Sequence, residues 1–356
     1  MHITYDIAPT PGHPRNSEGA FLSLADGRML FIYSAFSGES ARDHTPADLA
    51  AITSPDGGRT WSAPHTVVRA SEYDAMNVMS VSLLRMRDGA VGLFFLIRRS
   101  WSDMCVALRR SYDEGETFGP QTRCSPRTGY FVMNNDRVVR LSTGRILAPA
   151  AEHVCTPDGA GGIHLSPATA TCFFSDDDGV TWHEADAPVA LSGTPSRSGL
   201  QEPGLIELRG GTVFGWARTD LCMQYAFHSH DGGQRFTAPA PSGFTSPLSP
   251  LSMKRLPDGR LLALWNPIPE YQTRRSDWRT AGRTPLVYAL SRDEGRTWSE
   301  PEVLEDDPQT GYCYTAIAAI DGALLLAYCA GQAERDGLYL NRTRIRRIPL
   351  DELKES

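Results

Sequence analysis

Residues Ser54–Trp61 read SPDGGRTW, and this stretch decides the fold because its pattern recurs four more times along the chain. The pattern is S-x-D-x-G-x-[TR]-[WF], and its later copies are Ser111–Phe118 (SYDEGETF), Ser175–Trp182 (SDDDGVTW), Ser229–Phe236 (SHDGGQRF) and Ser291–Trp298 (SRDEGRTW). Successive copies begin 57, 64, 54 and 62 residues apart. Such even spacing indicates a fold built from repeated units.

Each copy predicts the tight turn of a β-hairpin. The Asp and Ser side chains can bond backbone amides in the turn, the Gly takes a positive φ angle, and the terminal aromatic ring packs between neighbouring sheets. We therefore expect these Asp residues to be structural and not to act as catalytic acids.

A second repeat consists of an apolar strand, a Gly-containing turn and another apolar strand. Its turn glycines are Gly27, Gly89, Gly144, Gly211, Gly259 and Gly322. Six such hairpins, with the five Asp-bearing hairpins between them, give about four strands per repeat. The sequence therefore predicts an all-β fold, a six-bladed β-propeller that residues 1–356 form as a single domain.

Two segments need a separate interpretation. A sixth Asp-bearing copy is missing, and Tyr339–Pro349 takes its place. We expect the N-terminal strand His2–Ile7 to pair there and to close the ring. Val67–Asp88 contains no Gly or Pro and is long enough for a helix, but within it we interpret Ser80–Met86 as a strand.

The composition narrows the class of protein. The formal net charge of −7 argues against a nucleic-acid surface. Seven cysteines without a CxxC pair fit a reduced protein better than a disulfide framework or a zinc site, so we expect neither a metal nor a cofactor. There is no apolar run long enough for a membrane span, and the start does not resemble a signal peptide. We therefore predict a cytoplasmic protein that does not bind membranes.

Propeller geometry predicts where a site lies. The innermost strand of each blade runs from one rim of the channel to its Gly turn, and the next strand returns to that rim. Polar residues at matching distances from the six turns therefore share one face, opposite the Asp-bearing turns. These residues are Arg15, Glu18, Asn77, Ser80, Arg98, Asn134–Asp136, Glu152, His153, Gln201, Glu202, Arg218, Ser249, Asn266, Tyr312 and Tyr314. Their convergence predicts a site for a small polar, anionic ligand.

The five Asp-bearing copies resemble the Asp boxes of the non-viral sialidase superfamily, and the resemblance covers nearly the whole chain. It implies an exo-glycosidase that removes a terminal sialic acid, or a related acidic sugar, from a glycan with retention of anomeric configuration. Asp boxes are specific for the fold and not for the reaction. Polar residues outside the usual sialidase pattern, such as Asn134–Arg137, indicate a divergent branch.

Sialidases use three arginines around the substrate carboxylate, a Tyr nucleophile paired with a Glu, and an Asp acid/base. The resemblance implies that Arg15 is the first arginine, although the following Asn16–Ser17 departs from the Ile-Pro of the family. Glu202 and Arg218 lie 16 residues apart across one hairpin. They resemble the Glu and the second arginine.

The third arginine and the nucleophile lie further along the chain. Arg283 precedes the fifth Asp box by eight residues and resembles the third arginine. Its competitors are Arg274, Arg275 and Arg279. Tyr314, in GYCYTAI, resembles the nucleophile. Tyr312 lies two residues earlier and is expected on the same side of the strand. It is the alternative nucleophile, and if Tyr314 is the nucleophile we expect Tyr312 to bind substrate.

For the acid/base we favour Asp43, 11 residues before the first Asp box, with Asp48 as the alternative. Asp43 lies in a polar loop, 37–46, that is suited to closing over a bound sugar. Three further residues are expected to bind the hydroxyl groups of the sugar ring, namely Asn77, Asn135 and Asp136.

Two other functions stay open. The same scaffold can support hydrolysis or β-elimination at another sugar, such as a uronic acid or a rhamnose-type glycan, with His153, Glu152 or Tyr314 as acid or base. It can also serve as a non-catalytic glycan-binding propeller, which does not need a Tyr–Glu pair. The presence of both Tyr314 and Glu202 favours an enzyme.

Overall fold

A computed structural model describes residues 2–159, 162–268 and 279–355. Nearly all of its regular structure is β. The helical turns in these residues are short, namely η1 (Ala70–Tyr73), α1 (Ala333–Asp336) and η2 (Leu350–Glu352). None of them is long and apolar enough to cross a membrane. The all-β prediction is confirmed, and the segment interpreted as a strand, Ser80–Met86, lies in β6 (Asn77–Arg85) except for its last residue.

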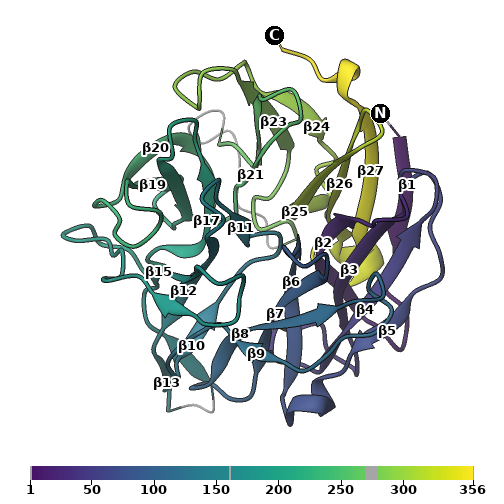
Figure 1. The fold of residues 1–356 in the computed structure, drawn as a ribbon, viewed down its shortest axis with the longest axis horizontal. Helices are drawn as coiled ribbons and strands as arrows, with labels where there is room; N and C mark the ends of the chain where they lie inside the picture. Colours follow the sequence, from purple (N-terminus) through teal and green to yellow (C-terminus); the bar gives the residue numbers. More distant parts are fainter. Residues whose placement is uncertain (1, 160–161, 269–278, 356) are drawn as a thin grey trace.

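Four antiparallel four-stranded sheets stand around a common centre (Figure 1). The first contains β2 (Arg15–Ser23), β3 (Met29–Phe36), β4 (Ala47–Ser54) and β5 (His65–Val68). The second contains β17 (Gln201–Glu207), β18 (Val213–Arg218), β19 (Met223–Ser229) and β20 (Ala240–Thr245). The third contains β21 (Ser252–Arg255), β22 (Leu261–Trp265), β23 (Leu286–Ser291) and β24 (Glu302–Glu305). The fourth contains β25 (Thr310–Ile320), β26 (Ala323–Gln332), β27 (Thr343–Pro349) and β1 (His2–Ile7).

The other strands form a nine-stranded sheet and a small hairpin. The sheet contains β6, β7 (Val91–Arg98), β8 (Met104–Ser111), β9 (Thr122–Arg123), β10 (Tyr130–Val132), β11 (Val139–Arg140), β12 (Ile146–His153), β15 (Thr169–Ser175) and β16 (His183–Glu184). The hairpin contains β13 (Cys155–Pro157) and β14 (Ile163–Leu165). Separate sheets were expected here, but β10 lies beside β8 through one parallel pair, Tyr130 with Met104. The number of blades therefore stays a prediction.

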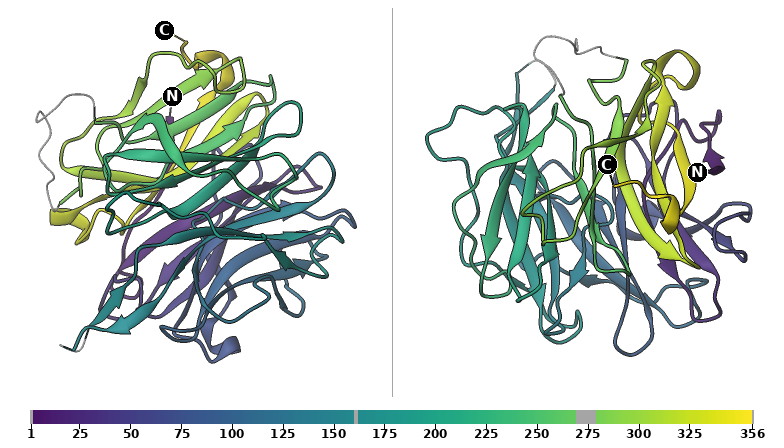
Figure 2. Two further views of the ribbon diagram at one scale, coloured as in Figure 1. Left: turned by 90° about the vertical axis from the view of Figure 1, so that its left-hand side faces the viewer. Right: turned by 90° about the horizontal axis from the view of Figure 1, so that it is seen from above.

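The N-terminal strand pairs where the sixth Asp-bearing copy is missing. β1 runs antiparallel to β27, from His2 opposite Arg347 to Ile7 opposite Thr343. In Figures 1 and 2 the purple strand lies beside the yellow one. Arg344 also pairs with Asp6 at 3.1 Å. The predicted pairing of the first strand is confirmed.

The Asp-bearing turns have the predicted hydrogen bonds. In the first copy, the Ser54 hydroxyl and the Thr60 amide donate to Asp56 Oδ1 at 2.9 and 2.8 Å. The hydrogen bonds from the Thr60 amide and side chain lower the pKa of Asp56 to about 2. The Trp61 ring packs 6.1 Å from that of Phe21. The same Ser-to-Asp bond recurs at Asp113, Asp177, Asp231 and Asp293.

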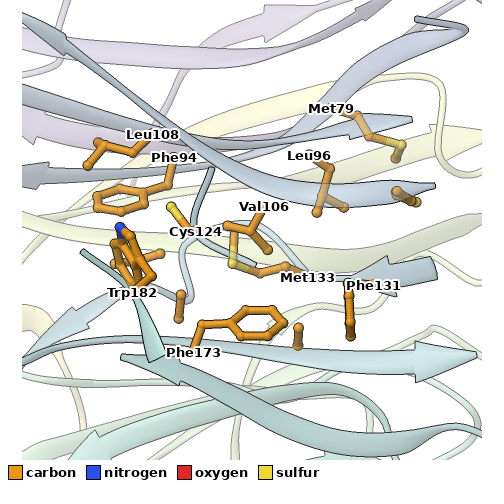
Figure 3. Packing of buried hydrophobic residues seen from close by; sticks show 14 of the residues in the cluster. Met79, Phe94, Leu96, Val106, Leu108, Cys124, Phe131, Met133, Phe173 and Trp182 are labelled. Atoms are coloured by element: carbon orange, nitrogen blue, oxygen red, sulfur yellow. The ribbon is translucent and has the colours of Figure 1, made fainter. Parts of the chain in front are cut away.

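Apolar clusters fill the space between neighbouring sheets. Figure 3 shows the cluster in which the Phe94 and Trp182 rings lie 6.0 Å apart and those of Phe131 and Phe173 lie 5.0 Å apart. Because this cluster joins side chains from consecutive repeats, burial of its apolar surface holds the repeats together. Five of its buried members also line the central pocket described below, namely Met79, Leu96, Met104, Tyr130 and Met133.

Candidate active site

Four inner strands carry a β-bulge near the centre of the molecule. The pairing register shifts at residues 17–20 of β2, 79–82 of β6, 201–204 of β17 and 313–316 of β25. Each bulge holds one residue at a positive φ, namely Glu18 (59°), Ser80 (59°), Glu202 (48°) and Tyr314 (58°). All four line one pocket. Bulges re-aim side chains, and strained backbone concentrates at functional sites, so we identify this pocket as the candidate functional site.

The pocket has one polar and one apolar side. Its other polar groups are Asp43, Arg98, His153, Gln201 and Arg218. Its apolar side includes Met79, Leu96, Met104, Tyr130 and Met133. The apolar residues were missed because each lies in an apolar strand that looks like ordinary core in the sequence. Only the observation that they flank the polar rim positions of the same hairpins could have found them.

Tyr314, Glu202 and Arg218 form a buried group at the base of the pocket. The Tyr314 hydroxyl donates to Glu202 Oε1 at 3.3 Å, and Arg218 Nη2 lies 3.1 Å from the same oxygen. Burial and the Glu202 charge raise the pKa of Tyr314 well above its usual value, while the nearby arginines oppose this shift. The hydroxyl is therefore protonated at neutral pH, and the adjacent carboxylate is placed to accept its proton.

Arg283 lies behind this group. Its guanidinium is 5.3 Å from the centre of the Tyr314 ring and 5.1 Å from that of Tyr339. Its Nη1 donates to Cys313 Sγ at 3.0 Å and its Nη2 to the Leu248 carbonyl at 3.2 Å. Among the described residues, neither Arg283 Nε nor Arg218 Nη1 has a hydrogen-bond partner, although both atoms are buried. Of the two, Arg218 lines the pocket, so its Nη1 can donate a hydrogen bond to a ligand there.

Arg15 connects two carboxyl groups at the other side of the pocket. Its Nη1 donates to Asp43 Oδ1 at 2.5 Å, and its Nη2 donates to Glu18. Partial loss of water acts to raise the pKa of Asp43, but its side chain is 64% exposed and the Arg15 charge outweighs this effect. The pKa of Asp43 is therefore lowered. In contrast, burial raises the pKa of Glu18 despite the Arg15 charge.

Two predicted hydroxyl-binding residues instead hold the backbone of the site. Asn77 donates to the carbonyls of Asp43 and Thr45 at 2.8 and 2.9 Å. Asn135 donates to the carbonyls of Gly19 and Tyr314 at 2.7 and 3.1 Å. Their side-chain nitrogens are occupied by main-chain acceptors, so they position the catalytic candidates, whereas the buried Oδ1 of each has no hydrogen-bond partner among the described residues. The loop 37–46, expected to close over a sugar, is therefore tied down at Asp43.

Two other predicted contacts lie elsewhere. Asp136 pairs with Lys254 at 2.8 Å and accepts the Ile317 amide at 2.9 Å, so it joins β21 and β25 below the pocket. Tyr312 is buried in the core, where its ring lies 6.2 Å from that of Tyr328. The bulge in β25 explains this placement, because it breaks the alternation that would have put Tyr312 and Tyr314 on one side.

The remaining competitors do not join the described pocket. Asp48 accepts the Ala70 amide at 2.8 Å and holds η1. Glu152 is bound by both terminal nitrogens of Arg127. Arg279 lies 3.7 Å from Glu334. Arg274 and Arg275 lie outside the described residues.

A second cavity is larger but chemically poorer. It occupies about 660 Å³ between the sheet of β17–β20 and that of β21–β24, whereas the central pocket occupies about 130 Å³. Phe214, Phe244, Trp265 and Trp298 line it, and its one carboxyl group, Glu294, is bound to Arg255 at 2.7 Å. We assign the site to the central pocket because nucleophile, base and acid candidates meet only there among the described residues.

Structures of known proteins share this fold. A protein of unknown function from Dyadobacter fermentans superposes with a TM-score of 0.73 at 17% identity, covering 98% of this chain and 99% of that one. The NanB sialidase of Streptococcus pneumoniae superposes with a TM-score of 0.72 at 13% identity, covering 99% of this chain and 71% of that one. The intramolecular trans-sialidase of Ruminococcus gnavus superposes with a TM-score of 0.74 at 14% identity, covering 99% of this chain and 98% of that one. At these identities the likeness establishes the fold alone.

Sequence comparison assigns the family. A search of curated proteins returned no match. The family model described as the BNR repeat-like domain matches residues 32–326, which is most of the chain. The expected likeness to the sialidase superfamily is confirmed by this match together with the sialidase structures. The chain therefore belongs to the BNR repeat-like domain family.

Proposed function

We propose that the protein is a sialidase-like exo-glycosidase that cleaves a terminal sialic acid, or a related acidic sugar, from a glycan. The observation that carries the proposal is the buried hydrogen bond between the Tyr314 hydroxyl and Glu202, 3.3 Å long, beside Arg218. A binding module has no need for a base beside a buried Tyr at a strained backbone position. The proposal also draws support from the sialidases that share the fold.

Tyr314 is the proposed nucleophile. Its oxygen forms a bond to the anomeric carbon while the bond from that carbon to the leaving oxygen breaks, and the Tyr proton passes to Glu202. A neutral nucleophile suits a substrate that carries a carboxylate on the anomeric carbon, because a carboxylate nucleophile would be repelled by it. Arg218 and Arg283 stabilise negative charge that develops on the Tyr oxygen.

Asp43 is the proposed acid/base. Its exposed carboxyl group lies at the mouth of the pocket, where the leaving group departs and water enters. It protonates the leaving oxygen in the first half of the reaction. In the second half it accepts a proton from the water that attacks the anomeric carbon, and Tyr314 recovers its proton from Glu202. Two displacements at one carbon retain its configuration.

The arginines are proposed to hold the carboxylate of the sugar. Arg218 lines the pocket, and Arg283 lies behind it with Nε unpartnered among the described residues. Each can donate charge-assisted hydrogen bonds to a carboxylate. Arg15, the predicted first arginine, already donates to Ser17, Ala41, Asp43 and Glu18.

We further propose that the nine-stranded sheet divides between β8 and β10, which gives one propeller domain of six blades. The single parallel pair between these strands supports the division. β6–β9 then form one blade, and β10–β12 with β15 and β16 form the next. This arrangement puts every proposed catalytic residue at one end of a central channel.

A second reaction is favoured by His153. Its Nδ1 lies 2.8 Å from the Ser166 carbonyl, which fixes the ring with Nε2 unprotonated, and burial lowers the pKa of the imidazole. A neutral His in a pocket with arginines suits β-elimination from a 4-linked uronic acid, in which the base removes the proton beside the carboxylate, a C4–C5 double bond forms and the C4–O bond to the neighbouring sugar breaks.

The test compares two tyrosines on one strand. Aryl glycosides of sialic acid, related ulosonic acids, glucuronic acid and rhamnose are supplied to the wild type, Tyr314→Phe and Tyr312→Phe. We expect hydrolysis of an acidic glycoside that Tyr314→Phe loses and Tyr312→Phe keeps. If Tyr314→Phe is as active as the wild type, Tyr314 is not the nucleophile. A 4-linked uronic acid disaccharide is supplied as well, and an unsaturated uronate product from it that is lost on replacement of His153 would favour the second reaction.

A further inference from the structure

Glu18 is a carboxyl group of the pocket that the proposed reaction does not use. It lies at the bulge of β2 with a φ of 59° and is 6% exposed. The next residue fixes this backbone, because a Cβ on Gly19 would lie 2.3 Å from the Phe31 ring and 2.7 Å from the Ile32 carbonyl oxygen. The chain therefore accepts strain in order to aim a carboxyl group at the pocket.

Glu18 also occupies an N–H group of Arg15 that could otherwise bind the substrate carboxylate. Every nitrogen of the Arg15 guanidinium donates to the protein: Nε to Ser17 Oγ at 2.9 Å, Nη1 to Ala41 O and Asp43, and Nη2 to Glu18. A bidentate contact with a substrate carboxylate requires two free parallel N–H groups. Arg15 offers them only by releasing at least one of these protein acceptors, and a released Glu18 or Asp43 carboxylate would repel the substrate.

Ser80 completes the position of Glu18. Its hydroxyl donates to Glu18 Oε2 at 2.5 Å from the bulge of β6, the neighbouring inner strand. Each carboxylate oxygen has a second acceptor site, so Glu18 can accept a further hydrogen bond after binding Arg15 and Ser80. Figure 1 places β2 and β6 on a different side of the centre from β17, the strand that precedes Arg218. Glu18 therefore lies on the β2 side of the pocket, and Arg218 with Glu202 lies on the β17–β18 side.

We propose that Glu18, held by Arg15 and Ser80, is a specificity-determining residue that accepts a hydrogen bond from a hydroxyl group of the sugar, while the sugar carboxylate lies toward Arg218. This inference rests on the proposed function, because it assumes an acidic sugar in the central pocket. It assigns the recognised group as a donor, since a second anion beside Glu18 is repelled. It also assigns Arg15 to positioning and not to the substrate carboxylate.

The experiment measures binding by calorimetry, with the unsaturated glycal of N-acetylneuraminic acid and its monodeoxy analogues as probes. Glu18→Gln removes the charge, and Glu18→Asp keeps the charge for Arg15 but withdraws the carboxylate by one methylene. The matched control is Glu114→Gln, since Glu114 also has a φ of 59° and pairs with an arginine, Arg85, at 2.9 Å outside the pocket. Circular dichroism checks the fold of each variant.

We expect both Glu18 variants to bind the parent glycal at least about tenfold more weakly, as for a lost hydrogen bond to a charged group. For one monodeoxy analogue the variants and the wild type should bind alike, because that analogue lacks the recognised hydroxyl. Unchanged binding of the parent, or an equal loss for every analogue, overturns the inference and leaves the proposed function standing. A wild type that binds neither this glycal nor the glycals of related ulosonic acids overturns the proposed function and this inference with it.

Discussion

Replacement of Arg218 by Lys tests how the pocket holds an acidic sugar. The guanidinium donates through Nε to Gln201 at 3.2 Å and lies through Nη2 3.1 Å from Glu202, and its buried Nη1 has no partner among the described residues. Burial acts to lower the pKa of Arg218, but the Glu202 and Tyr314 oxygens outweigh it, so the side chain stays charged. A Lys keeps this charge but, as a point charge, cannot make all these contacts together.

The expected loss follows from one charge-assisted hydrogen bond. It is about 1.5 kcal/mol or more, which is at least about a tenfold rise in Kd for the glycal of sialic acid in calorimetry. The control is Arg292→Lys, because Arg292 is 72% exposed and pairs with Glu355 at 2.8 Å on the surface. A rise in Kd for Arg218→Lys no larger than in this control would refute a direct contact between Arg218 and the ligand.

Three further predictions concern Asp43, Asn77 and Asp56. The lowered pKa of Asp43 leaves its carboxyl group ionised at neutral pH, whereas the acid role needs it protonated. For alkyl glycosides, whose leaving group needs a proton, kcat/KM should therefore rise about tenfold per pH unit as pH falls, and for aryl glycosides it should change less. Parallel pH profiles for the two kinds of glycoside would contradict the acid role. Asn77→Ala frees the loop that carries Asp43, and should lower kcat for alkyl glycosides more than for aryl ones, with KM nearly unchanged. Asp56→Ala should cost about 1–3 kcal/mol of unfolding free energy in urea and spare turnover per folded molecule. The stability from Asp56 is present above pH 4 and lost as pH falls through its pKa of about 2, so the variant should lose less stability in acid.

Much of the fold could be predicted because its signals are local. The turn of Ser54–Trp61 specifies its own hydrogen bonds, and the spacing of its copies sets the length of each repeat. The pairing of His2–Ile7 with β27 followed from the one copy that is missing. The contact of Tyr130 with Met104 could not be predicted, because the crossing of one short strand between repeats leaves no periodic signal.

The strand pattern indicated that Glu202, Arg218 and Tyr314 lie near one another, but it gave no sign of the bulges that aim these side chains. Arg218 pairs directly with Gln201, and the bulge at residues 201–204 brings the Glu202 carboxylate to the Arg218 guanidinium. The bulges in β2 and β25 aim the side chains of Glu18 and Tyr314 into the pocket by holding both residues at positive φ. Sequence patterns associate this conformation with glycine and not with Glu or Tyr. Tyr312 was misplaced for the same reason.

The central claim is that Tyr314 forms a covalent bond to the sugar. A fluorinated sialic acid that slows release of the glycosyl-enzyme is mixed with the wild type and with Tyr312→Phe, and the protein mass and its peptides are then measured. The account predicts a mass increase of one sugar in both proteins, mapped to the peptide that contains Tyr314. Turnover of the sugar with no adduct, or an adduct on another residue, would contradict it.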